Sequence, residues 1–371
     1  MKKTNIAPTR LEDCIRQILP DAHGHQQKAL VDFVFALISV GSCCQAALAD
    51  FFGNFEASLK RLSRLIHNER LNIEELALAQ ARFIVARLPQ VGDIRIAIDW
   101  TEEKGKYLLV ASLLVGRRGV PLFWRAYRQS ELKGRTSQIE QDFIHTLVTV
   151  VLKGVARKRL LLTADRGFAD LVLMKLLNKM KVSYVIRTKA NVKVYIDREW
   201  RKLGSLTWKG NQRRRALGRL KYCQREPLRV YVTQARERNH QGKWGVWNLL
   251  SNRNFSAYQA ADEYSRRWGC EAGFRDAKSL LGFKEAAIKD LEAWARMFTL
   301  VAIALLVLIG VGISLIKGME AFKEVLRRVR SRRKARSDKS LVRCVAELLR
   351  KQRSYWDFLF LQDKLNLEAT L

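Results

Sequence analysis

The segment YSRRWGCEAGFRDAK, residues 264–278, places charged and aromatic side chains along one side of a predicted helix. At about 3.6 residues per turn, five side chains fall within an arc of about 80°: Tyr264, Arg267, Glu271, Arg275 and Lys278. An exposed ladder of Arg–Glu–Arg pairs would account for the three central residues and would contribute only tenths of a kcal/mol. That ladder does not explain the bracketing tyrosine and lysine, which favour a functional face.

An apolar segment, MFTLVAIALLVLIGVGISLI at residues 297–316, follows shortly after this helix. It contains no charged residue and is long enough to cross a bilayer. A helix buried on all sides in a large core gives the same pattern. The chain has no second segment of this kind, and basic sequence flanks it on both sides. The segment alone leaves both interpretations open.

The composition indicates a polyanionic partner. The chain has 371 residues, with 68 Lys and Arg against 36 Asp and Glu, and a formal net charge of +32. Such an excess in a folded chain is typical of nucleic-acid binding and less often of binding to an anionic membrane. The six cysteines form no CxxC pair, which favours reduced thiols in the cytoplasm. No apolar stretch follows the basic N-terminal residues, so we expect no secretory signal.

Residues 1–88 are predicted to be helical, because apolar residues recur at spacings of three and four. Within them, QAALADFFGNFEASLKRLSRLIHN has the outline of two helices joined by a Gly-Asn turn. This outline is similar to a helix-turn-helix DNA reader, with Lys60, Arg61 and Arg64 on its second helix. The same outline is common in helical bundles, so it does not decide between them.

The sequence changes period after residue 89. Short β-prone runs (94–100, 107–115 and 120–127) are followed by helical patterns alternating with runs at 159–165 and 182–188. This order predicts an α/β fold with a mixed five-stranded sheet and flanking helices. Residues 190–252 are basic and β-prone, which indicates an inserted subdomain.

Two carboxylates end predicted strands: Asp99 in IAIDWT and Asp165 in LLTADRG. Carboxylates at the C-terminal edge of a sheet can hold a divalent metal ion. The alternative is that each Asp begins a turn or caps the next helix. Glu271 is the best candidate for a third carboxylate. Oxygen ligands without a Cys/His cluster favour Mg²⁺ or Mn²⁺ over zinc.

Tyr264, Arg267, Glu271 and Lys278 are separated by two, three and six residues. This spacing resembles the YREK signature of the bacterial insertion-sequence DDE transposases, and the resemblance covers most of the chain. It implies an RNase H-like catalytic core in which Asp99, Asp165 and Glu271 bind two Mg²⁺ or Mn²⁺ ions. The implied regions are a helical N-terminal DNA-binding domain (1–88), a catalytic core in two parts (89–189 and 253–318), a basic β-rich insertion between them (190–252) and a basic helical C-terminal region (319–371).

The resemblance also implies an activity. Such an enzyme binds the terminal inverted repeats of its element, cleaves the ends and joins the 3′-OH ends to target DNA, through hairpin ends. Arg267 and Lys278 would grip phosphates and Tyr264 would donate a hydrogen bond to one, while the role of Arg275 stays open between DNA contact and support of Glu271. Trp244 and Trp247 are candidates for stacking on a flipped base, although ordinary packing in the insertion is the favoured interpretation of each.

The same resemblance favours the buried-helix interpretation of residues 297–316 and no membrane association. It implies a homodimer, at least on DNA, in the bacterial cytoplasm at the nucleoid, with residues 319–371 serving dimerisation or DNA contact. Two alternatives share these sequence features. One is a host-domesticated DDE nuclease that cuts without transposing, and the other is an inactive DNA-binding regulator.

Overall fold

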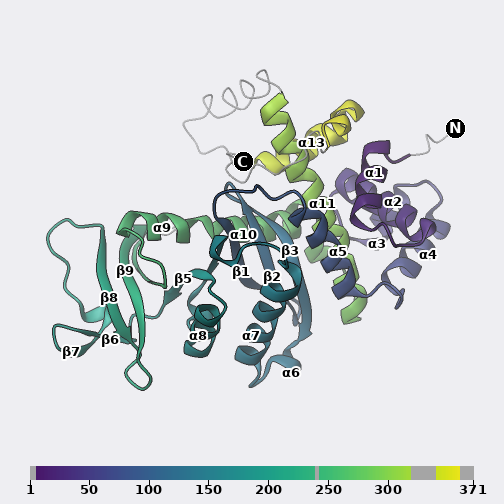
Figure 1. Cartoon of the computed structure of the whole chain (residues 1–371). Coiled ribbons are helices and arrows are strands. Elements are labelled where there is room, and N and C mark those ends of the chain that lie inside the picture. Colours follow the sequence, from purple (N-terminus) through teal and green to yellow (C-terminus); the bar gives the residue numbers. More distant parts are fainter. Residues whose placement is uncertain (1–5, 239–241, 319–339, 360–371) are drawn as a thin grey trace.

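The computed structural model describes residues 6–238, 242–318 and 340–359. One ten-stranded sheet runs through it in the order β3-β2-β1-β4-β5-β10-β9-β8-β6-β7 (Figure 1). The core strands are β1 (Ile94–Glu103), β2 (Lys106–Val115), β3 (Arg118–Arg128), β4 (Leu160–Ala164) and β5 (Ser183–Thr188). Short turns make β1, β2 and β3 antiparallel, whereas helical crossovers make β1, β4 and β5 parallel. The predicted mixed α/β fold with flanking helices is confirmed.

The insertion lengthens this sheet instead of forming a separate one. Its strands are β6 (Lys193–Ile196), β7 (Glu199–Lys202), β8 (Arg214–Tyr222), β9 (Leu228–Arg238) and β10 (Trp244–Ser251). The last of them, β10, pairs antiparallel with β5, matching Asn248 with Thr188. The sequence predicts β-structure here but not this continuity, because strand pairing depends on contacts between residues far apart in the chain.

Alternation along β1 separates the two faces of the core sheet. Ile96, Ile98 and Trp100 point to the face covered by α7 (Thr136–Thr146) and α8 (Leu171–Lys179), where the Trp100 Nε1–H donates to Glu140 of α7 at 2.7 Å. Ala97 and Asp99 point to the other face, toward α9 (Ala257–Arg266) and α10 (Trp268–Arg275). The catalytic candidates therefore lie on the α9/α10 face.

The long apolar helix α11 (Leu291–Gly318) passes through the core. It is long and apolar enough to cross a membrane, but 94% of its most apolar stretch of 18 residues is buried inside the protein. Arg296 of α11 is itself buried and donates to the backbone carbonyls of Leu71 and Ile66. The helix thereby joins the N-terminal helices to the sheet.

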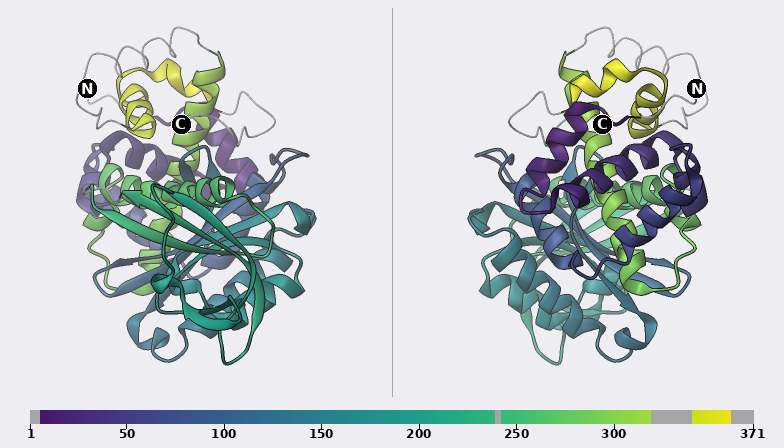
Figure 2. Two further views of the ribbon diagram at one scale, coloured as in Figure 1. Left: turned by 90° about the vertical axis from the view of Figure 1, so that its left-hand side faces the viewer. Right: turned by 90° about the vertical axis from the view of Figure 1, so that its right-hand side faces the viewer.

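The remaining helices gather at the end of the molecule beyond β3 (Figure 2). Residues 319–339 and 360–371, which carry much of the predicted C-terminal region, lie outside the described residues. The C-terminal helix α13 packs on α11 and α2. The helices that gather there are α1 (Thr9–Ile18), α2 (Gly24–Val40), α3 (Gln45–Asp50), α4 (Phe55–Ile66), α5 (Ile73–Val85) and α13 (Leu341–Lys351). The short α6 (Gln129–Leu132) instead packs on β3 and lies below α7 in Figure 1.

The Trp100–Glu140 contact predicts a pH-dependent stability. Burial raises the pKa of Glu140 to about 7, although the Trp100 hydrogen bond lowers it. Because the folded-state pKa is raised, the neutral carboxyl stabilises the fold below pH ~4.5, and this stabilisation is lost as the pH rises through about 7. Glu140→Gln keeps the acceptor oxygen and removes the charge. We expect it to be more stable than wild type at pH 8, by up to ~3 kcal/mol.

Urea unfolding at several pH values between 4.5 and 8 measures this difference. The gap between the two proteins should close toward the acidic end. Parallel curves for wild type and Glu140→Gln would show that another group titrates.

Candidate active site

Asp99 and Asp165 lie side by side on neighbouring strands. Asp165 directly follows β4, as predicted, whereas Asp99 does not end its strand, because β1 continues to Glu103 through its pairing with β2. The parallel register of β1 and β4 pairs Ile94 with Leu160 and continues to Ile98 with Ala164. The next position along this register matches Asp99 with Asp165. Neighbouring strands are about 4.8 Å apart, so the two aspartates occupy equivalent places on adjacent strands.

Glu271 approaches these two aspartates from α10. The helix that the sequence predicts as continuous is divided at Arg267, where α9 ends and α10 begins, and a π-helical turn (Asp276–Leu280) follows α10. Arg267 is only 4% exposed. The interpretation of this segment as a solvent-exposed Arg–Glu–Arg ladder is therefore wrong.

Arg267 bridges two of the three carboxylates. One terminal nitrogen of its guanidinium donates to Asp99 Oδ2 at 2.7 Å and the other to Glu271 Oε1 at 2.5 Å. The Tyr264 hydroxyl donates to Asp165 Oδ1 at 3.0 Å, and Arg187 of β5 lies 3.9 Å from the same oxygen. Each carboxylate thus has a defined polar partner on the α9/α10 face.

The two aspartates have opposite pKa shifts. Burial raises the pKa of Asp99 to about 6, with Arg267 lowering it and Glu271 and Asp165 raising it. Burial also acts on Asp165, but the backbone N–H of Arg166 and the charge of Arg267 outweigh it and lower the pKa of that carboxyl. Burial raises the pKa of Tyr264 to about 12, so its hydroxyl remains a hydrogen-bond donor at neutral pH.

Three glycines determine how closely α10, which carries Glu271, packs on the sheet. A Cβ on Gly273 would meet the backbone oxygen of Gly119 in β3 at 2.8 Å, and a Cβ on Gly269 would lie 3.0 Å from the backbone of Arg117. A Cβ on Gly119 would in turn lie 2.9 Å from the Cα of Cys270. Helix and strand therefore pack backbone against backbone, which only glycine permits.

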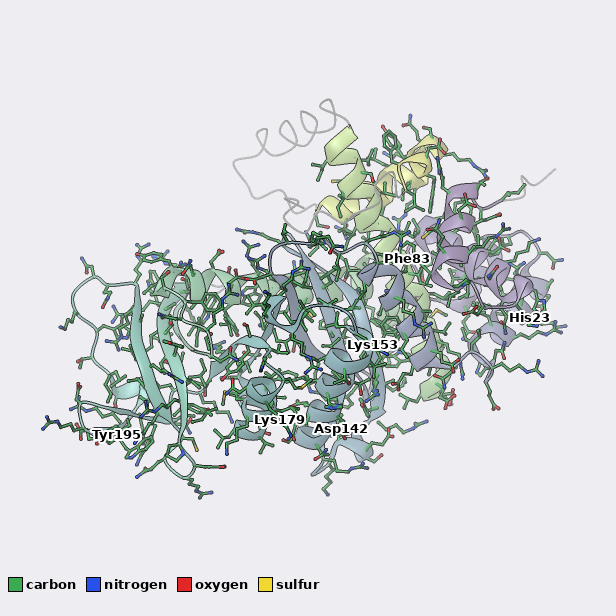
Figure 3. All side chains as sticks on the ribbon, viewed as in Figure 1. His23, Phe83, Asp142, Lys153, Lys179 and Tyr195 are labelled. Carbon is green, nitrogen blue, oxygen red and sulfur yellow. The ribbon has the colours of Figure 1, made fainter. Side chains whose placement is uncertain are left out.

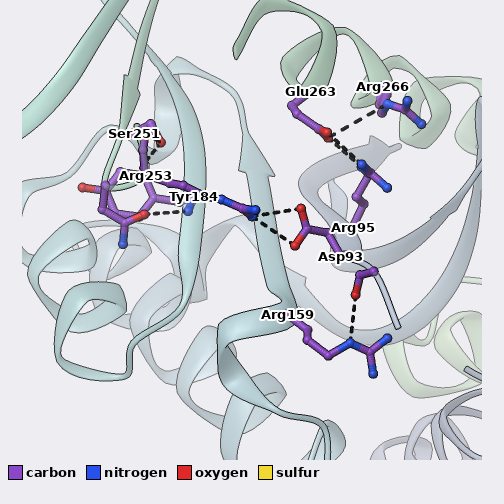
Figure 4. Close-up of polar contacts among 10 residues, drawn as sticks. Asp93, Arg95, Arg159, Tyr184, Ser251, Arg253, Glu263 and Arg266 are labelled. Carbon is purple, nitrogen blue, oxygen red and sulfur yellow. Dashed lines mark hydrogen bonds and ion pairs between the residues drawn. The ribbon is translucent and has the colours of Figure 1, made fainter. Parts of the chain in front are cut away.

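Ion pairs tie α9 and the residues just before it to β1 and the residues just before that strand (Figure 4). Arg95 of β1 donates two hydrogen bonds to Glu263 of α9, at 2.6 and 2.8 Å. Arg253 donates to both oxygens of Asp93 at about 3 Å. Arg159 binds the backbone carbonyls of Gly92, Pro89 and Val91 in the segment between the N-terminal helices and β1.

The other residues of the predicted face have different surroundings. Lys278 donates to the backbone carbonyl of Glu102 at 2.6 Å and lies 3.8 Å from Glu103, so it holds the end of β1. Arg275 is exposed, and the ion pair of Glu271 is with Arg267. Trp247 packs edge-on against Tyr264 with ring centroids 5.0 Å apart, whereas Trp244 is 53% exposed.

The two predicted helices of the N-terminal pair are α3 and α4, and they lie far along the molecule from the carboxylates (Figure 1). Lys60 and Arg64 are exposed on α4. Arg61 instead turns inward, pairs with Asp32 of α2 at 2.8 Å and stacks over Phe33. Arg61 therefore joins α4 to α2.

The types of ligand at the site suit a divalent cation, although their spacing does not. Three carboxylates supply the hard oxygen ligands that Mg²⁺ and Mn²⁺ prefer, and the mutual effects on Asp99 show that they lie within electrostatic reach of one another. Over the described ranges, no three His, Cys, Asp or Glu side chains are grouped closely enough to hold one metal ion. The spacing is that of a site organised around the Arg267 guanidinium.

In a comparison with protein families, residues 143–307, somewhat less than half of the chain, match the family described as Transposase DDE domain. The match supports a DDE transposase. It contains Asp165 and Glu271 but begins after Asp99, whose place in the site rests on the register of β1 and β4. No curated protein matches the chain.

Transposases of this family generally use divalent metal ions and act on DNA, and the large mixed sheet with flanking helices is consistent with their RNase H-like fold. Arg187 and Arg95 are site residues that the sequence interpretation missed. Each is a charged residue inside an apolar strand run, VSYVIRT and IRIAIDW. A charged residue in such a run indicates a buried ion pair, because a strand covered on both faces rarely carries an unpaired charge.

The glycine contact predicts a stability cost. Gly273→Ala should lower the free energy of unfolding, since overpacking costs about 1–3 kcal/mol and the helix-propensity gain of Ala is at most about 1 kcal/mol. Urea unfolding provides the measurement. Gly24→Ala in α2 is the matched control, because a Cβ there meets nothing within 4 Å. Equal stability of the two variants would rule out the close packing of α10 on β3.

Proposed function

We propose that this protein is a cut-and-paste DNA transposase that binds the terminal inverted repeats of its insertion sequence, cleaves the ends and joins the 3′-OH ends to target DNA. The observation that carries the proposal is the meeting of Asp99, Asp165 and Glu271 on one face of the sheet, joined through Arg267 and Tyr264. The YREK spacing and a net charge of +32 support it.

In this proposal Asp99, Asp165 and Glu271 are the metal ligands. Two Mg²⁺ or Mn²⁺ ions, when bound, would activate the attacking oxygen and neutralise charge that develops on the phosphate. Water is the first nucleophile and frees a 3′-OH. That 3′-OH then attacks the opposite strand to give a hairpin and, after reopening, the target DNA.

In the proposal, the residues around the carboxylates bind and orient the DNA. Arg267 carries a planar fork suited to two oxygens of a phosphate, but its two terminal nitrogens donate to Asp99 and Glu271, so it would bind a phosphate only after leaving one of them. Tyr264 holds Asp165 in place through its hydroxyl. Trp247 supports the Tyr264 ring, so Trp244, the exposed indole, is the better candidate for stacking on a flipped base.

The remaining parts of the proposal concern assembly. The protein works as a homodimer on paired DNA ends, in the bacterial cytoplasm at the nucleoid and without membrane insertion. Burial of α11 supports the last point. Lys60, Arg64 and Arg275 are exposed and available to DNA, and Lys278 would contact a phosphate only after leaving the end of β1.

Removal of the carboxylates tests the chemistry. Asp99→Ala and Glu271→Ala should each reduce Mg²⁺-dependent cleavage of a duplex carrying the native element ends by more than ~100-fold, because even outer partners of metal ligands are worth about 10- to 100-fold. Denaturing gels measure cleavage and reveal hairpins. Asp142→Ala is the control, since Asp142 is an exposed acid on α7, across the sheet (Figure 3).

Normal cutting by both carboxylate variants would reject the site. Cleavage without joining to target DNA would favour the nuclease alternative. Binding of the ends by wild type without any cleavage would favour the regulator.

A further inference from the structure

A basic hollow lies at the end of the β8–β9–β10 ribbon, outside the carboxylate site. It consists of two adjoining cavities of about 720 and 490 Å³ that share Arg213, Arg236 and Trp244. Arg238 and Tyr258 line the larger one. We call these five residues the Arg–Trp groove.

Strand register creates the groove. Arg236 and Arg238 are two positions apart on β9 and therefore point to one face, where Trp244 of β10 lies opposite Arg238. The backbone N–H of Arg236 donates to the carbonyl of Arg213 at 2.7 Å, which brings the third arginine alongside. Two of the cations, Arg213 and Arg238, thus lie beside the Trp244 ring, and Arg236 lines the same hollow.

The three guanidinium groups stack on aromatic rings. Arg213 and Arg238 lie 5.7 and 4.8 Å from the Trp244 ring centroid, and Arg236 lies 4.4 Å from that of Trp208. Stacking fixes the plane of a guanidinium and leaves its N–H donors at the edge, in the fork that matches phosphate oxygens. The side chains are held ready to bind an anion.

The charge of the groove is not neutralised by the described part of the chain. Its one acid, Glu237, pairs with Arg214 at 2.6 Å. Within residues 6–238, 242–318 and 340–359, none of Arg213, Arg236 and Arg238 pairs with a carboxylate. Like charges held this close repel one another, and a polyanion would relieve the repulsion.

We propose that the Arg–Trp groove binds the phosphodiester backbone of duplex DNA next to the cleaved phosphate. Residues two apart on a strand are about 7 Å apart. Successive phosphates of one DNA strand rise about 3.4 Å each along the axis and, because the strand also winds around it, are about 7 Å apart in space. Arg236 and Arg238 can therefore bind neighbouring phosphates of the same strand, with Arg213 beside them. This inference rests on the proposed function.

The position of the groove suits DNA bound at the carboxylates. Tyr258 lines the groove and Tyr264, six residues later on α9, binds Asp165. At about 1.5 Å per residue the two tyrosines are about 9 Å apart along the helix. Figure 1 shows α9 leading from the insertion strands to α10. One DNA segment can reach both sites, since a full turn of DNA is about 34 Å long.

The salt dependence of binding tests the proposal. The triple variant Arg213→Gln, Arg236→Gln, Arg238→Gln is titrated with a 30-base-pair duplex of random sequence, without divalent metal, from 50 to 200 mM KCl. Each phosphate contact contributes about 0.9 to the slope of log affinity against log salt. We expect the slope to become shallower by about 2.7, and Arg238→Gln alone to change it by about 0.9.

A charge-matched control is Lys153→Gln, Lys158→Gln, Lys179→Gln. These exposed lysines lie by α7 and α8, on the far face of the core sheet; Figure 3 labels Lys153 and Lys179. The control should keep the wild-type slope. Equal slopes for the groove variant and wild type would overturn the proposal, as would a loss confined to single-stranded DNA. If the groove variant loses slope while wild type cleaves no DNA, the groove stands and the proposed activity fails.

Discussion

The buried guanidinium of Arg267 is the interaction on which the catalytic half of the structure depends. It joins a strand residue, Asp99, to a helix residue, Glu271, that is 172 positions later in the chain. Burial of one charge is costly, and a buried network is stable only when its partners are all present. Asp99 and Glu271 supply that compensation, and a second ion pair, Arg95–Glu263, lies four residues earlier on the same strand. Helix and sheet are thereby fixed by charge at two points.

Around Glu271, α10 packs on the sheet through glycines. Gly269 and Gly273 let α10 approach Gly119 of β3 at backbone distance, and short side chains fill the space beside it, where Ala97 and Cys270 pack together. A closer helix places the Glu271 carboxylate nearer the strand ends without a longer side chain. Precise placement of the Glu271 carboxylate thus comes from the main chain, which is stiffer than a side-chain contact.

The sequence predicts the parts of this arrangement that depend on local pattern. Apolar strand runs ending in Asp99 and Asp165, and the helical spacing of Tyr264, Arg267 and Glu271, are visible because alternation and 3.6-residue periodicity follow from burial. It does not reveal that Arg61 turns toward Asp32 or that β10 continues the core sheet, because each depends on a partner distant in the chain. The same reason hides the contact of Gly119 with α10, although the two glycines four residues apart hint at close packing.

The pairing of Thr188 with Asn248 has a consequence for how such a chain can diverge. The polypeptide leaves the core at one strand and returns on the strand beside it, so the two exit points stay adjacent whatever lies between them. Segments can be gained or lost beyond this junction while Asp165 and Glu271 keep their separation in space. The number of residues between the two acids can then change during evolution without disturbing the site. The insertion is therefore a part of the chain in which new contacts can evolve.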